Sequence, residues 1–116
     1  MWQEIEQAME DLQKCLEEYK KYSNDYAKKE YLYRTALSKR LVALREAGEK
    51  VTHLADIARG EKEIAKLRFD RDIAEGLKKS SEEGINYYKL KIRVLEGQLN
   101  REWGASKFQW ETKVKN

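Results

Sequence analysis

The sequence predicts an all-α fold: a long, antiparallel, coiled-coil-like helical hairpin with a short connector helix. Three observations support this prediction. The chain of 116 residues contains no proline, a residue that costs roughly 3 kcal/mol inside a helix. Residues 1–47 contain no glycine, whereas Gly48 and Gly60 bracket a short connector. On both sides of that connector, apolar residues recur at steps of three, four or seven, which is the period of paired helices.

The first helix is expected to span residues 1–47. Its apolar positions are Ile5, Met9, Leu12, Leu16, Tyr19, Tyr26, Tyr33, Leu37 and Leu44. Gly48 is a natural stop, because glycine readily adopts the left-handed conformation in which many helices end. Arg45 lies one turn earlier, where a cation suits the negative end of the helix dipole.

The connector, residues 48–60, is expected to hold a short helix. Thr52 is predicted to cap it, since a threonine hydroxyl can accept a hydrogen bond from an unpaired backbone amide. Leu54 and Ile57 then come to lie on one side of this helix. We expect them to close the apolar end of the hairpin against Leu44 and Ile64.

The second long helix is expected over residues 61–103. Its apolar positions are Ile64, Leu67, Ala74, Ile85, Tyr88, Ile92, Leu95 and Leu99. The segment Ser80–Glu83 has the spacing of a capping box, so a break near residues 76–81 is an alternative to one continuous helix. Residues 1–104 would form the hairpin domain. Residues 105–116 would form a tail, either a final short helix or a loose end.

A register follows if the hairpin is centred near Leu54, because residue i then lies near residue 108 minus i. At the ends this rule joins apolar residues: Ile5 with Trp103, Met9 with Leu99, Leu41 with Leu67 and Leu44 with Ile64. In the middle each pair contains at least one polar residue: Ser23 with Ile85, Ala27 with Ser81, Glu30 with Lys78 and Leu37 with Arg71. Both helices therefore become polar at the same level.

Two interpretations of this polar, tyrosine-rich level stay open. Ion pairs and tyrosine hydroxyls in a helix seam can fix register and oligomeric state. Alternatively, cations that meet phosphate and tyrosines that stack on a base would form a nucleotide pocket. The candidate ligand-binding residues are Tyr26, Tyr33, Arg34, Arg68, Arg71, Lys78 and Tyr88.

Self-association into a homodimer or a higher helical bundle is also expected, because one seam between two helices buries few side chains. The apolar residues that do not fit the internal seam are Leu32, Val42, Phe69, Ile73, Leu77, Leu90 and Val94. Contact with another protein would instead use exposed aromatic residues, for which the candidates are Trp103, Phe108 and Trp110.

Several function classes are not expected. A net charge of +3 with interspersed signs makes nucleic acid an unlikely partner. One cysteine and one histidine do not make a metal site. No cofactor motif, catalytic constellation, membrane-spanning stretch or signal peptide is recognisable, so we expect a cytoplasmic protein that is not an enzyme. Cys15 is expected to be a small buried hydrophobe.

Three segments carry a family resemblance: AKKEYLYRTAL at residues 27–37, LREAGEKVTHLADIARG at 44–60 and LRFDRDIA at 67–74. Over roughly residues 27–103, the chain resembles small, mostly unannotated helical proteins from early regions of temperate phages and prophages of Gram-positive bacteria. The resemblance implies a helical hairpin in the cytoplasm of a bacterial host.

Small phage proteins of this type are often antagonists of host defence. The resemblance therefore implies a non-catalytic binding protein that sequesters a nucleotide immune signal, such as a cyclic nucleotide. Two alternatives stay open: direct contact with a host defence protein, in the manner of an anti-CRISPR, and an accessory or structural role in phage DNA metabolism.

Overall fold

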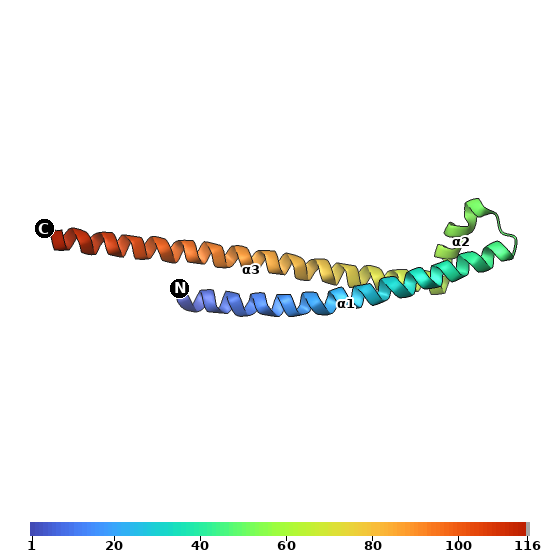
Figure 1. Ribbon diagram of the computed structural model, residues 1–116, viewed down its shortest axis with the longest axis horizontal. Coiled ribbons are helices and arrows are strands. Elements are labelled where there is room, and N and C mark those ends of the chain that lie inside the picture. Colours follow the sequence, from blue (N-terminus) through green and yellow to red (C-terminus); the bar gives the residue numbers. More distant parts are fainter. Residues whose placement is uncertain (116) are drawn as a thin grey trace. The chain divides into compact units, whose positions relative to one another are not determined.

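The computed structural model describes the backbone of residues 1–115 and the side chains of residues 1–50 and 52–105. Over these residues the fold is all-α and contains no strand, as predicted. The elements are α1 (Trp2–Glu46), the short 3-10 helix η1 (Val51–His53), α2 (Leu54–Gly60) and α3 (Lys62–Lys115), all labelled or visible in Figure 1. None of the helices has a described stretch long and apolar enough to cross a membrane.

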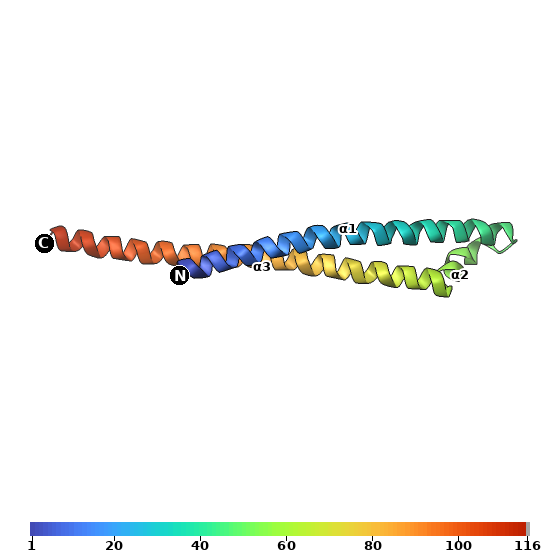
Figure 2. The same ribbon diagram turned by 90° about the horizontal axis from the view of Figure 1, so that it is seen from below.

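The chain divides into two compact units, and both long helices contribute to each. Unit 1 consists of Met1–Glu17 together with the chain from Glu82 onwards, and unit 2 consists of Glu18–Ser81. Within each unit, segments of α1 and α3 lie side by side and run in opposite directions (Figures 1 and 2). Unit 2 also contains η1 and α2, so it is a helical hairpin closed by the predicted connector helix.

The core of unit 1 is a cluster of apolar side chains. Ile5, Ala8 and Leu95 are buried together, and Ile92 and Leu99 pack against them. These positions follow the three-four spacing of each helix, so burial of this stripe stabilises the pairing of the two segments.

A small core closes the connector end of unit 2. Leu44 of α1 is buried with Leu54 and Ala58 of α2. The prediction for Leu54 and Leu44 is therefore correct, whereas the one for Ile57 is wrong because this side chain is 40% exposed. The one-turn spacing of Leu54 and Ala58 places these two residues, and not Ile57, on the side of α2 that faces α1.

Gly48 ends α1 as expected. Its φ is 88°, its N–H donates to the carbonyl of Arg45 at 3.1 Å, and the N–H of Glu49 donates to the carbonyl of Leu44 at 3.2 Å. These two bonds form a Schellman cap. The expected cap by Thr52 is wrong, because Thr52 lies inside η1, and neither η1 nor α2 has a side-chain cap.

The register differs from the predicted one by four to seven residues, which is about one to two helical turns. Glu30 was expected beside Lys78 but forms an ion pair with Arg71, and Lys78 lies over Tyr26 instead. The cause is α2, which packs on the last turns of α1 where the start of α3 was expected. Glu61, between α2 and α3, consequently pairs with Arg40, with 2.7 Å between Oε1 and Nε.

The displacement also changes the pairs predicted at the two ends of the hairpin. Leu44 packs with α2 rather than pairing with Ile64 as expected. The expected contacts of Met9 and Trp103 within the seam are wrong too, because these side chains are 55% and 70% exposed.

Helix α3 is longer than predicted. It continues without a break through the candidate capping box at Ser80–Glu83, where Ser81 donates instead to the carbonyl of Leu77 at 3.0 Å. It also passes Gly104 and reaches Lys115, so the expected end at Trp103 is wrong. An isolated glycine costs only about 1 kcal/mol, which a long cooperative helix without proline can absorb.

Candidate functional site

Four arginines meet in an open groove of unit 2. Arg34 of α1, Arg59 of α2, and Arg68 and Arg71 of α3 line it together with Tyr33 and Leu37, around a volume of about 360 Å³. Three separate helices therefore deliver positive charge to one place. We call this feature the arginine groove.

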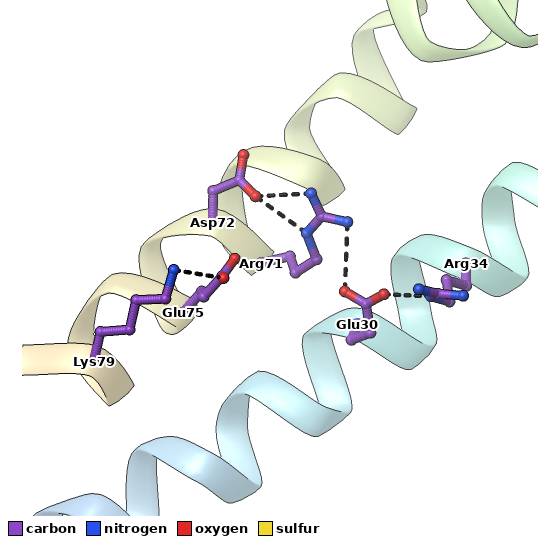
Figure 3. A network of polar contacts seen from close by, with 6 residues as sticks. All are labelled: Glu30, Arg34, Arg71, Asp72, Glu75 and Lys79. Carbon is purple, nitrogen blue, oxygen red and sulfur yellow. Dashed lines mark hydrogen bonds and ion pairs between the residues drawn. The ribbon is translucent and has the colours of Figure 1, made fainter. Parts of the chain in front are cut away.

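Arg71 is the most enclosed of these cations, with 19% of its side chain exposed. Its guanidinium carbon lies 4.6 Å from the centre of the Tyr33 ring. It also binds Asp72, with 2.8 Å between Nη2 and Oδ1, and Glu30, with 3.4 Å between Nη1 and Oε2 (Figure 3). The hydrogen bond that Arg71 donates to Asp72 is the main cause of a raised Arg71 pKa. Arg71 thus links α1 to α3 and covers one face of the only buried tyrosine among the described side chains.

Glu30 bridges two cations. Figure 3 shows its carboxylate between Arg34, one turn along α1, and Arg71 on α3. The hydrogen bond from Arg34 lowers the pKa of Glu30, burial opposes this shift, and the charges of Arg34 and Arg71 reinforce it. The carboxylate is therefore ionised at neutral pH and neutralises part of the groove.

The remaining two arginines are less engaged. The Nη1 atom of Arg59 lies 3.9 Å from Oδ1 of Asp56, and the Asp56 side chain is 85% exposed. Arg68 forms no ion pair with any described side chain. Guanidinium groups present several N–H donors in a plane and bind phosphate or carboxylate oxygens in pairs. Arg59 and Arg68 are thus the cations best placed to meet an anion.

Only part of the predicted ligand-binding set lines this groove. Tyr33, Arg34, Arg68 and Arg71 do so. Tyr26 and Lys78 form a second cation–π pair in unit 2, with the Lys78 nitrogen 5.2 Å from the ring centre. Nearby on α3, Lys79 binds Glu75 at 3.0 Å, an interaction that raises the Lys79 pKa (Figure 3).

Tyr88 belongs to unit 1. It meets Tyr87 edge to face, with ring centres 5.0 Å apart. Its pKa is raised, first by burial and then by the charge of Asp11. Cys15 lies in the same unit and is half-buried, with its Sγ 3.0 Å from the position that a Cβ on Gly84 would occupy. Tyr88 is therefore a packing residue of the unit 1 seam rather than a lining residue of the groove.

The candidate protein-contact residues are only partly described. Trp103 is 70% exposed on α3. Phe108 and Trp110 lie outside the residues whose side chains are described. Exposure alone leaves Trp103 available to a partner without identifying one.

Sequence reasoning missed Arg59. The register rule paired the two long helices only with each other, so the connector was never considered as a wall of the site. The spacing of Leu54 and Ala58 could have indicated the place of Arg59. If these two residues form the buried side of α2, Arg59 lies next to that side.

The described side chains contain no group of three histidine, cysteine or carboxylate residues placed to hold a metal ion. Comparison with protein-family models, with curated proteins and with solved structures finds no match to this chain. The phage resemblance therefore stays an expectation, and a functional proposal must rest on the arginine groove itself.

Proposed function

We propose that this protein is a non-catalytic binding protein that holds a phosphorylated small molecule in the arginine groove. The observation that carries the proposal is the convergence of four arginines from α1, α2 and α3, of which Arg68 has no ion-pair partner among the described side chains. Phosphate groups are the anions that best match planar guanidinium donors.

The aromatic part of the expected nucleotide pocket has less support. Tyr33 is 5% exposed and Arg71 already covers its ring, so no open tyrosine face lines the groove. A nucleotide would be held mainly through its phosphates. In the phage setting implied by the resemblance, such binding would withdraw a nucleotide signal from host defence, and a cyclic nucleotide would be a suitable ligand.

The test is a calorimetric and thermal-shift screen with inorganic phosphate, mononucleotides and cyclic dinucleotides at low and high salt. We expect binding that weakens as salt rises, because partly exposed charge pairs are screened. Arg68→Ala and Arg59→Ala should each weaken binding about tenfold to a hundredfold, since a charge-assisted hydrogen bond is lost. Arg45→Ala, an exposed arginine outside the groove, is the matched control and should bind like the parent.

The proposal fails if no phosphorylated compound gives heat or raises the melting temperature. In that case the ion pairs of Arg71 serve to fix the register of the two helices, which is the other role expected of them.

A second candidate, contact with a host protein, rests on the 70% exposed Trp103. An aromatic side chain of this kind commonly anchors an interface. Trp103→Ala should then abolish recovery of a stoichiometric host protein while leaving phosphate binding unchanged.

A further inference from the structure

Helix α3 carries exposed apolar side chains in both units. Besides Trp103, these are Phe69, Ile73 and Leu77 in unit 2 and Tyr87, Leu90 and Val94 in unit 1, with exposed fractions between 42% and 63%. Leu32 and Val42 of α1 are exposed as well. All seven residues expected to lie outside the internal seam therefore do so. Apolar side chains repeated along one helix at this exposure indicate a surface that another helix covers.

Phe69, Ile73, Tyr87, Leu90 and Val94, five of these six residues of α3, fall on one heptad, and Leu77 lies beside it. Positions 69, 73, 76, 80, 83, 87, 90 and 94 are separated alternately by four and three residues, which is the spacing of a coiled-coil stripe. The stripe is apolar toward both ends. In the middle it contains Gly76, Ser80 and Glu83.

The stripe is also symmetric about the peptide bond between Ser81 and Glu82. Phe69 and Val94 lie equally far from that point, as do Ile73 and Leu90, and Gly76 and Tyr87. Two copies of α3 that run in opposite directions would therefore place apolar residues opposite apolar residues at both ends of the stripe, with Ser80 opposite Glu83 at its centre. Such a self-matching surface is what a two-fold symmetric interface requires.

We propose that α3 is the dimerisation helix, and that a second copy of this chain packs along it antiparallel, with the two-fold axis at Ser81–Glu82. Phe69 would then contact Val94 of the partner subunit, and Ile73 would contact Leu90 of the partner subunit. Tyr87, with 58% of its surface exposed, would lie over Gly76 of the partner subunit. A Cβ at Gly76 would meet no heavy atom within 4 Å, so this position has room for an incoming ring.

The charges beside the stripe favour a second copy as the occupant. Toward the start of α3 the acidic residues beside the stripe are Asp70, Asp72 and Glu75, interspersed with the basic residues Arg68 and Lys79. Of these acids, Asp72 and Glu75 also bind Arg71 and Lys79 within the subunit. Toward the end of α3 the flanking residues are basic, namely Lys89, Lys91 and Arg93, and these three form no ion pair with any described side chain.

Antiparallel pairing brings each acid near a base. Asp70 would face Lys91 of the partner subunit, Asp72 would face Arg93 of the partner subunit, and Glu75 would face Lys89 of the partner subunit. The two-fold axis would form each of these contacts twice. A parallel pairing would instead place acid on acid and base on base, which disfavours it.

Disulfide trapping tests the register. Two variants are prepared in a Cys15→Ala background, one with Ile73→Cys and the other with Leu90→Cys. Each variant by itself, and an equal mixture of the two, is equilibrated in glutathione buffer. We expect a covalent dimer in the mixture and little in either preparation alone, because the two-fold axis pairs residue 73 with residue 90. Equal trapping in each preparation alone would show a parallel or non-specific contact and overturn the proposal.

A second measurement does not depend on cysteine chemistry. Sedimentation equilibrium should show a dimer, and Asp70→Lys should raise its Kd on the order of tenfold, since two partly exposed pairs become repulsive. Combining Asp70→Lys with Lys91→Asp should restore the parent Kd, whereas Glu46→Lys, a matched reversal at the exposed end of α1, should leave it unchanged.

A monomeric mass at high micromolar concentration would refute the proposal, as would a dimer indifferent to both charge reversals. Neither result depends on whether the arginine groove binds phosphate, so the two proposals can fail separately.

Discussion

Unit 1 and unit 2 are built from the same two helices but hold them together differently. The buried core of unit 1 is apolar, and no ion pair occurs among the described side chains of this unit. Five of the six charged residues in its α1 segment, Met1–Glu17, are acidic. All the ion pairs of the described side chains lie in unit 2, where Glu30 and Arg71 join α1 to α3. An ion pair of this kind contributes little net stability, because desolvation offsets much of the attraction. Unit 2 has a further apolar core to offset this, formed by α2 against α1.

The largest expected effect comes from breaking that apolar core. Leu54→Asp places a charge at a position that is 4% exposed, so unfolding free energy should fall by about 3–5 kcal/mol. Urea denaturation measures the loss. Ile57→Asp, on the exposed side of α2, is the matched control and should change stability by less than about 1 kcal/mol. Equal effects of the two variants would mean that α2 is not docked on α1.

A smaller effect is expected from the ion pair itself. Arg71→Ala leaves Glu30 without its partner on α3, and we expect a loss of about 1–2 kcal/mol, below the cost for a fully buried pair. Glu30→Gln in the Arg71→Ala background should recover part of this loss, because no carboxylate then needs a partner. Denaturation of the four chains in a double-mutant cycle gives the coupling energy. A coupling energy of zero would mean that the Glu30–Arg71 ion pair does not stabilise unit 2, whose stability would then come from its apolar core.

The smallest effect is a dependence of stability on acid pH that arises from Glu30 in unit 2. The pKa of Glu30 in the folded chain is lowered from its ordinary value of 4.5, chiefly by the hydrogen bond from Arg34. The stability that this carboxylate contributes is therefore complete above pH 4.5 and is lost as pH falls through the lower, folded pKa. Thermal melts between about pH 6 and about pH 3 should show a shallower acid slope for Glu30→Gln than for the parent. Parallel slopes would contradict the assignment.

The helices and the separation of an apolar seam from a polar one were predictable from sequence, because both follow from periodicity. On α3, the three-four spacing of Ile92, Leu95 and Leu99 identifies one side of the unit 1 core without coordinates, and on α1 Ile5 belongs to the matching stripe. Gly48 marks the end of α1 for a local reason, its left-handed φ of 88°.

The register and the full arginine groove were not predictable by the same means. Both depend on where α2 packs, which is a tertiary contact between Leu44, Leu54 and Ala58. No periodicity of the long helices encodes that contact, so the displaced register and the place of Arg59 in the groove became visible only in three dimensions.

The most deeply buried side chains are small, and their packing bears on how fast an anion could enter the arginine groove. Ala8 in unit 1, and Ala58 and Ala74 in unit 2, are at most 1% exposed. Alanine at a helix contact permits close approach, toward the lower end of the usual interaxial distance of about 8–10 Å. The space between the helices is therefore filled, and the arginine groove lies at their edge. An anion would reach its guanidinium groups without separating the helices, so its association rate should follow ionic strength and diffusion rather than a slow opening step.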